Sequence, residues 1–179
     1  METMKTLNNL RSVRVFDQNK RISEETMKMI LEASVRAATA SHRQSYAIID
    51  IDDREVIRST FGNNGDRALL YCVDIDRLEQ LARRLGVVFD NKGMVEYHSG
   101  IIDTILAAQT AVIAARSLGV DSVIHQSLQF KDMNAIYEQF NIPKHKCFPV
   151  MATIEKENRV LELLKEIEDS DGGFGRESR

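Results

Sequence analysis

Hydrophobic positions recur along the chain in two patterns, one typical of helices and one of strands. A spacing of about three to four residues predicts amphipathic helices, and short β-branched runs predict strands. Helices are expected at 24–36, 54–60, 76–85, 101–118, 133–140 and 160–167, and strands at 46–51, 68–73, 120–124 and 148–154. The order of these elements predicts an α+β fold, with a central sheet flanked by helices.

The segment 101–118 has the strongest helical pattern of the chain. Its only charged residues are Asp103 and Arg116, and alanines recur along its length. A helix that is apolar nearly all round has to be buried on nearly all sides. The sequence therefore predicts either the central helix of one domain or a helix that also packs against a second subunit.

Two stretches lack a regular pattern. Residues 87–100 are polar and irregular, which is compatible with a mobile lid or with an ordinary connection. Residues 169–179 are rich in glycine and charge, and we expect them to form a flexible C-terminal tail. No linker divides the remainder, so 1–168 is predicted to be a single domain.

Composition narrows the class of protein. The chain has 179 residues with 43% hydrophobic content, which is enough for one soluble domain with a proper core. A net charge of −3 gives no argument for nucleic acid or a membrane surface as partner. The two cysteines form no C-x-x-C pair, the N-terminus lacks a signal-like apolar core, and no apolar run approaches bilayer-spanning length. A cytoplasmic protein is expected.

Common catalytic templates do not match this sequence. The four histidines are isolated, without H-E-x-x-H spacing, and there is no Walker loop or nucleophile elbow. The glycines at 172, 173 and 175 neither follow a predicted strand nor begin a helix, so they do not form a dinucleotide-binding fingerprint. The sequence predicts no metal site and no dedicated catalytic residue.

Two stretches remain as candidate binding segments. In the first, Arg11 and Arg14 bracket the hydroxyl of Ser12, and their guanidinium groups suit phosphate or carboxylate recognition. The second, 37–46, is rich in small and hydroxyl residues and would let a ligand approach closely. A solvated basic patch and a plain helix-to-strand connection are the alternative interpretations.

Together these stretches resemble the nitroreductase family of flavin-dependent oxidoreductases. Residues 11–16, R-S-V-R-V-F, are similar to the family's R-R/x-S-x-R-x-F segment, and 37–45 to its A-P-S-x-x-N-x-Q-P motif. The helix with Asp103 and Gln109 looks like its D-x-x-x-A-x-Q helix, and Ile142-Pro143 like the L-P before its last core strand. The resemblance extends from Leu7 to Ile154.

The resemblance implies a nitroreductase-like fold, with a mainly antiparallel sheet and a long buried central helix. It also implies a homodimer that holds FMN at the subunit interface. NAD(P)H would reduce FMN, and a small acceptor such as a quinone or nitroaromatic would reoxidise it in a ping-pong reaction. Because the flavin carries the hydride chemistry, the protein only has to bind and tune it.

The resemblance also assigns the cofactor-binding residues. Arg11 and Arg14 would reach the ribityl and phosphate part of FMN, and Gln126 and Ser127 would pass close to its ring. The full set of implied cofactor-binding residues is Arg11, Ser12, Arg14, Thr39, Ser41, His42, Gln44, Gln126, Ser127 and Arg159.

Several positions depart from the family pattern. Ala38 and Ser45 replace its prolines, and His42 replaces its asparagine. The family's Gly-x-Pro turn and following basic pair correspond to 155–159 here, where only Lys156 or Arg159 could supply the phosphate charge. The alternative hypotheses are a catalytically degenerate dimer that binds another ligand or none, and a bare α+β domain with a solvated arginine patch.

Overall fold

The computed structural model describes residues 2–14, 19–89, 94–144 and 147–157. Within them, four strands form one antiparallel sheet in the order β1–β2–β4–β3. The strands are β1 (Tyr46–Ile51), β2 (Arg67–Asp74), β3 (Val120–His125) and β4 (Cys147–Glu157). The helices are α1 (Glu2–Asn8), α2 (Glu24–Ser34), α3 (Arg54–Phe61), α4 (Ile75–Leu85), α5 (Met94–Ser117) and α6 (Met133–Gln139), with short 3-10 turns η1 (Ala40–His42) and η2 (Ser127–Phe130).

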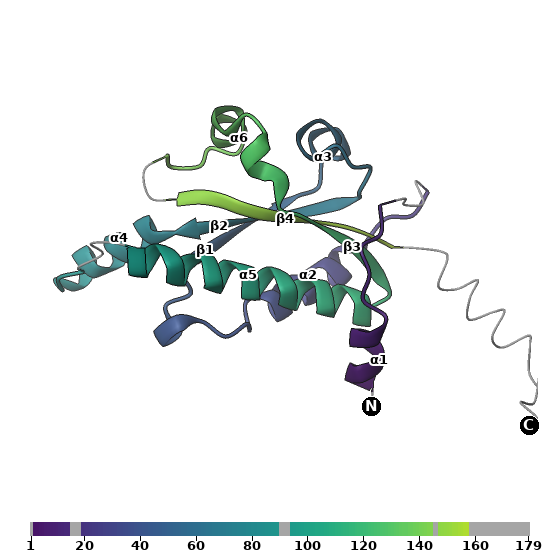
Figure 1. Ribbon diagram of the computed structural model, residues 1–179, viewed down its shortest axis with the longest axis horizontal. Helices are drawn as coiled ribbons and strands as arrows, with labels where there is room; N and C mark the ends of the chain where they lie inside the picture. Colours follow the sequence, from purple (N-terminus) through teal and green to yellow (C-terminus); the bar gives the residue numbers. More distant parts are fainter. Residues whose placement is uncertain (1, 15–18, 90–93, 145–146, 158–179) are drawn as a thin grey trace, which may run out of the picture.

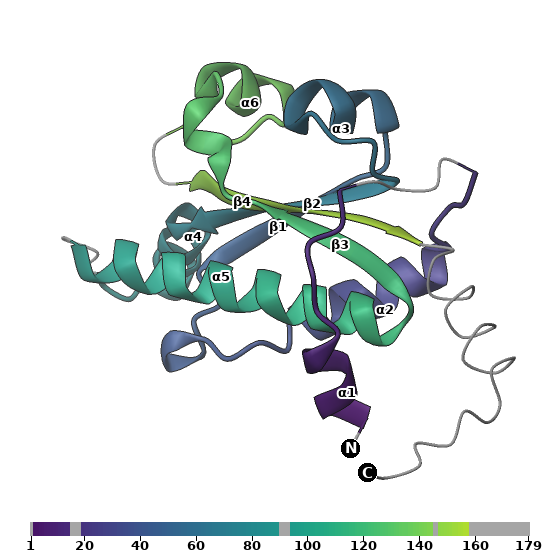
Figure 2. The same ribbon diagram turned by 45° about the vertical axis from the view of Figure 1, so that its right-hand side comes forward.

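Helices cover both faces of the sheet. Figure 1 shows α3 and α6 above the sheet and α2 and α5 below it, and the turned view in Figure 2 shows the same layers. Each layer has its own hydrophobic cluster, with Ile57 and Leu70 on the first side and Ile30 and Leu69 on the second. The prediction that 68–73 is a strand buried on both faces is confirmed.

The ends of the helices follow from their capping residues. Ser23 accepts a hydrogen bond from the Thr26 N–H at the start of α2, as its place before two glutamates predicts. Gly86 ends α4 in the left-handed conformation, which glycine adopts without strain. The short helix α1 was not expected from the sequence, and none of its side chains is buried.

Helix α5 differs in two ways from the expected segment at 101–118. It begins at Met94, so the region without a predicted structure contributes its first two turns. Its small residues Ala107, Ala108 and Ala111 are fully buried, which lets the helix lie close to the sheet. Ile102, Ile105 and Leu106 remain 42%, 38% and 40% exposed on this chain. Burial on nearly all sides is therefore not achieved within one chain.

The length of α5 also corrects one expectation from the sequence. By length and composition alone, Met94–Ser117 is long and apolar enough to cross a bilayer. In the fold it packs on the sheet, and 44% of its most apolar window is buried. Core helices of soluble proteins pass the same test, so this segment gives only weak evidence for a membrane.

Residues 10–14 run along the outer edge of β3. Ser12 forms a parallel bridge with Ser122, and the Val13 N–H donates to the Ser122 carbonyl at 3.0 Å. This pairing extends the sheet beyond β3 and fixes the backbone between Arg11 and Arg14. The predicted helix at 160–167, the tail at 169–179 and Arg159 lie outside the described residues.

Glu155 on β4 is a fully buried carboxyl group. Its Oε1 accepts a hydrogen bond from the Thr153 hydroxyl at 3.0 Å, and its Oε2 has no partner among the described residues. Burial raises the pKa of Glu155 to about 7, the charge of Asp50 adds to this rise, and the Thr153 hydrogen bond opposes it. Near neutral pH the fold therefore holds a carboxyl group that resists ionisation.

We expect this group to make the fold less stable as the pH rises. Because its pKa is higher in the folded than in the unfolded chain, its stabilisation is complete below pH 4.5 and is lost as the pH approaches 7. The loss amounts to at most about 3 kcal/mol. Glu155→Gln should remove this component, so denaturant unfolding from pH 4.5 to 7.5 should show a flatter curve for the variant. Parallel curves for the two proteins would contradict the assignment.

Candidate functional site

The segment that follows α2 lines the largest of the cavities described for the chain. This cavity has a volume of about 600 Å³, and its walls include Thr39, His42 and Gln44 together with Val35–Ala38. His42 is exposed, and Thr39 and Gln44 are half-buried. Three of the predicted cofactor-binding residues are therefore brought together, and Ser41 lies exposed in the same turn.

The backbone of this turn is strained. Ser41, His42 and Gln44 have φ values of 52°, 56° and 50°, in the left-handed region that favours glycine. Each such residue costs roughly 1–2 kcal/mol relative to the right-handed conformation. Strain of this kind persists only where surrounding contacts impose it, and it is concentrated at ligand-binding sites.

Asp103 of α5 supplies two of those contacts. Its side chain is fully buried, Oδ1 accepts the Ala40 N–H at 2.8 Å, and Oδ2 accepts the Ser45 N–H at 3.3 Å. These bonds tie both ends of the strained turn to the central helix. The sequence drew attention to Asp103 as one of two charges in the apolar segment 101–118, but it did not show this role.

The second group of predicted residues lies at the N-terminal segment. Arg11 and Ser12 line a groove of about 220 Å³ with Gln109 of α5 and Ser122 of β3. Both side chains are exposed, and so is that of Arg14. The positive charge of Arg14 acts on His125 at the end of β3, which places this guanidinium beside the same edge of the sheet.

His125 is held as a neutral imidazole. Burial lowers its pKa, and the positive charges of Lys131 and Arg14 lower it further. Its Nε2 faces the side-chain nitrogen of Asn63, which suits a donor amide and an unprotonated acceptor nitrogen. The charge of this edge therefore comes from Arg14 and Lys131. His125 was not among the predicted site residues. The four histidines of the sequence are isolated, so no motif pointed to this one.

The remaining predicted residues are only partly described. Gln126 is exposed directly after β3, and Ser127 begins η2, but its side chain lies outside the described structure, as does all of Arg159. Lys156, one of the two candidates for the phosphate charge, is fully buried within β4. That hypothesis is wrong for Lys156, because 155–157 continue the strand and do not form a turn.

The two groups do not meet within one chain. No residue lines both the cavity at 35–44 and the groove at Arg11 and Ser12. Figures 1 and 2 show the two segments toward different ends of α5, with the turn below its N-terminal half and the N-terminal segment running alongside its C-terminal half. The larger cavity and the groove are therefore separate features of the single chain.

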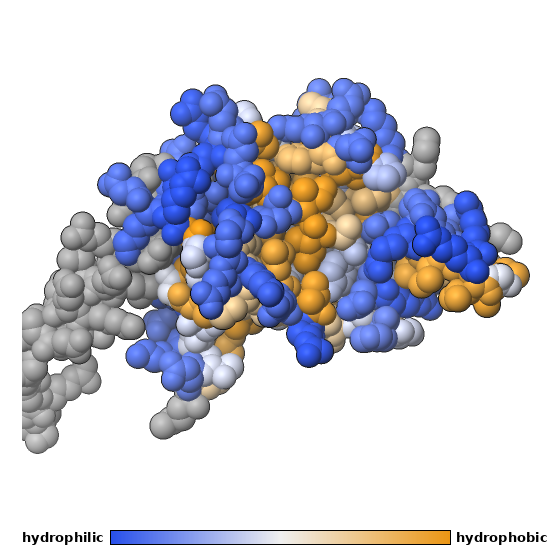
Figure 3. Space-filling model, turned by 180° about the vertical axis from the view of Figure 1, so that it is seen from behind, coloured by the Kyte–Doolittle hydropathy of each residue, from blue (hydrophilic) through white to orange (hydrophobic). Residues whose placement is uncertain are grey.

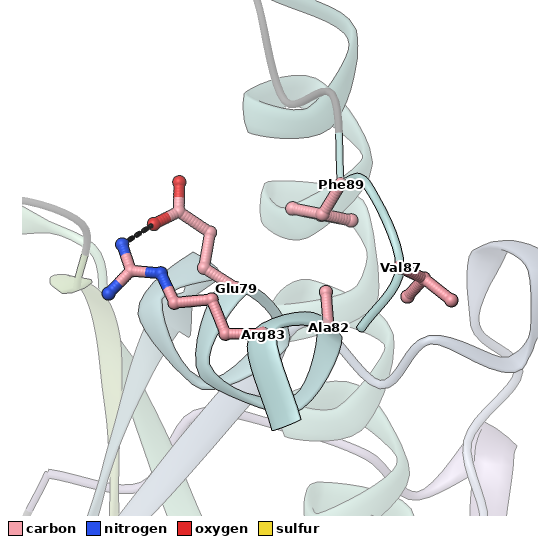
Figure 4. A pocket seen from close by; sticks show the side chains of 5 residues that line it. All are labelled: Glu79, Ala82, Arg83, Val87 and Phe89. Atoms are coloured by element: carbon pink, nitrogen blue, oxygen red, sulfur yellow. Dashed lines mark hydrogen bonds and ion pairs between the residues drawn. The ribbon is translucent and has the colours of Figure 1, made fainter. Parts of the chain in front are cut away.

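A further cavity, of about 250 Å³, lies between α4 and the connection to α5. Figure 4 shows Ala82, Val87 and Phe89 around it, with the ion pair of Glu79 and Arg83 at one side. The rear view in Figure 3 shows hydrophobic surface at the edge that carries α4, where Leu85 and neighbouring apolar side chains are exposed. None of the predicted site residues lines this cavity.

The order and position of these segments agree with a family model. A model described as the nitroreductase family matches residues 8–154, which is most of the chain. The chain belongs to the nitroreductase family. The predicted family and the predicted α+β fold are confirmed, and both segments and the central helix fall inside the matched range.

Relatives in the nitroreductase family are longer than this chain. A Cr(VI) reductase of Pseudomonas sp. (strain G-1) is 30% identical over 152 residues, covering 80% of this chain and 61% of the relative. FMN reductase (NADPH) of Bacillus subtilis (strain 168) is 28% identical over 155 residues, with coverage of 80% and 61%. The chain thus spans about three-fifths of the curated relatives it matches.

Solved nitroreductase structures share the fold. B. megaterium NfrA2 superposes with a TM-score of 0.82 at 21% identity, covering 89% of this chain and 67% of that protein. The NADPH:FMN oxidoreductase from Vibrio harveyi, complexed with NAD+, gives 0.75 at 20% identity, with coverage of 89% and 70%. At such low identity these nitroreductase structures establish the architecture alone.

Proposed function

We propose that this protein is an FMN-dependent NAD(P)H oxidoreductase. The observation that carries the proposal is the pair of family segments, one cationic and one strained, that the fold places on either side of the central helix. Relatives named NADPH-dependent oxidoreductase and FMN reductase (NADPH) support the same activity. The acceptor is a small oxidant such as a quinone or nitroaromatic, reduced in a ping-pong cycle.

The residues present fit the chemistry of FMN. The larger cavity, at about 600 Å³, has the size of typical ligand sites, which span roughly 300–1,000 Å³. Its lining offers a hydroxyl, an imidazole and an amide to a polar ring edge. Arg11 and Arg14 are exposed, and their planar guanidinium groups suit a phosphate or an electron-rich ring edge.

The protein supplies binding and orientation, and the bound flavin would supply two-electron transfer from NAD(P)H to the acceptor. Arg11 and Ser12 would hold the phosphate and ribityl part, because both line the groove beside β3. Arg14, beside neutral His125, would add positive charge at this edge. With Lys156 buried, the described cations at the two groups of site residues are Arg11 and Arg14 of the N-terminal segment and Arg36 of the larger cavity.

The proposed active form is a homodimer. Each chain presents the two groups of site residues separately, and the apolar side chains of Ile102, Ile105 and Leu106 are partly exposed on the α5 surface between them. Pairing of two chains through this surface would bury it and bring the groups together. The largely apolar character of residues 101–118 of α5, which one chain covers only partly, favours this arrangement.

A second candidate function is a ligand-binding dimer without catalysis. It is favoured by the replaced family positions Ala38, His42 and Ser45. His42 and Ala38 line the larger cavity, so its surface differs from the family pattern where a flavin ring would lie.

A visible absorption spectrum of the purified protein distinguishes the two functions. The oxidoreductase should carry a flavin spectrum that moves into the supernatant after heat denaturation, and NAD(P)H oxidation should then depend on an added quinone or nitroaromatic. A protein that stays colourless after incubation with FMN would overturn the proposal in favour of the binding dimer.

A further inference from the structure

We propose that Asp103 is the positioning residue of the site, and that it holds the turn 40–45 in its strained, ligand-ready conformation. The proposal rests on the function proposed above and adds a residue that touches neither cofactor nor substrate. Asp103 would raise the affinity for FMN by holding the turn in its binding conformation in the free protein.

The first argument is the geometry of the carboxylate. Asp103 is buried in the middle of an otherwise apolar face, where an ionised side chain is costly unless its oxygens are satisfied. Each oxygen receives one backbone N–H, from Ala40 and from Ser45. Ala40 and Ser45 lie on either side of the residues with left-handed backbone angles. The two hydrogen bonds therefore fix both ends of the turn to the same side chain.

The second argument is that each of the other side-chain and strand contacts described for the turn reaches only one end of it. The Arg77 guanidinium of α4 donates to the Gln44 carbonyl, and the Ser45 carbonyl accepts the Asp74 N–H at 3.0 Å. Arg43 pairs with Glu96 of α5 at 3.1 Å. Asp103 itself is fully buried and bonds to both ends of the turn, through a buried bond to Ser45 and a part-buried bond to Ala40. Water therefore competes little with the Ser45 bond.

The third argument links the turn to the cavity. His42 and Gln44 are both left-handed and both line the cavity wall. If the turn relaxed to ordinary backbone angles, these side chains would leave the wall, and a ligand would have to restore them at the expense of its own affinity. A preformed turn avoids this ordering cost.

The test is Asp103→Asn, which keeps the shape of the side chain. An amide has only one acceptor oxygen, so its NH₂ group must face one of the two backbone N–H donors. Asp121→Asn is the matched control, because Asp121 is equally buried but is bound to Arg116 near the opposite end of α5. Any effect common to both variants reports general loss of a buried carboxylate.

Hydrogen exchange on the flavin-free protein decides the proposal independently of function. In Asp103→Asn, the amides of Ala40 and Ser45 should exchange at least about 10-fold faster, while β2 amides keep their protection. Asp121→Asn should leave the turn unchanged. Unaltered exchange at both amides in Asp103→Asn would overturn the proposal, whether or not the protein binds FMN.

FMN affinity gives the second readout. Asp103→Asn should weaken FMN binding by roughly 10- to 100-fold, with kcat per bound flavin nearly unchanged. Adding Ser41→Gly, which adopts the left-handed angle without strain, should recover part of that loss. Strictly additive effects of the two substitutions would contradict a strained turn held by Asp103. If wild type binds no FMN, the proposed function fails while the exchange result still stands.

Discussion

Replacing Arg14 with alanine is expected to weaken FMN binding by about 2–5 kcal/mol, or roughly 30- to 5,000-fold. In the single chain this guanidinium is exposed, and its positive charge lowers the pKa of His125. On binding, it would become a desolvated partner of the anionic cofactor, and its removal would leave that charge without compensation. Burial, the main cause of the lowered His125 pKa, remains in this variant and still disfavours a charged imidazole in place of the lost guanidinium.

The measurement is a fluorescence titration of flavin-free protein with FMN. Arg58→Ala serves as the control, since Arg58 is an exposed arginine on α3, on the opposite side of the sheet from α5. Losing it changes the net charge equally but should not change the affinity. Equal affinities for Arg14→Ala and wild type would show that the cationic segment is only a solvated patch.

Replacing Ile105 with arginine is expected to convert the proposed dimer into a monomer and to release the flavin in the same step. Ile105 lies with Ile102 and Leu106 on the exposed apolar surface of α5. Burying one such side chain contributes about 1.5–3 kcal/mol, and a charge in its place opposes association further. Because the two groups of site residues lie apart on one chain, the monomer would hold only half of the cofactor contacts.

Light scattering and the visible spectrum should be recorded on the same sample. Leu85→Arg provides a matched control, because Leu85 is an apolar residue, 67% exposed, that belongs to a different helix, at the end of α4. That variant should remain dimeric and yellow. A monomeric Ile105→Arg protein that keeps its flavin would refute the shared site, and a dimeric one would place the interface elsewhere.

The strands were predicted well because their apolar residues are also the residues that the sheet buries. β2 is apolar along its length and lies in the middle of the sheet, so local pattern and final environment agree. The start of α5 was missed for a tertiary reason. Gly100 lowers the helical signal, yet a Cβ there would lie 2.7 Å from a methyl group of Val73, so the close packing of α5 on β2 requires glycine.

The site was predicted as a set of residues but not as an arrangement. Family motifs identified Arg11, Arg14 and the turn at 37–45, whereas the contacts that shape the turn join residues 58 and 63 positions apart. No local pattern carries that information. The end of β4 misled the prediction for a similar reason: 155–157 look polar enough for a turn, but pairing with β2 and β3 draws them into the sheet.

The strand order has a consequence for synthesis on the ribosome. β4 is the last described strand of the chain, yet it lies between β2 and β3 and pairs with both. Until residues 147–157 have emerged, the nascent chain presents two open strand edges and an incomplete core. We therefore expect the fold to form only after residues 147–157 have emerged from the ribosome, and a chain cut before Cys147 to be bound by chaperones or degraded.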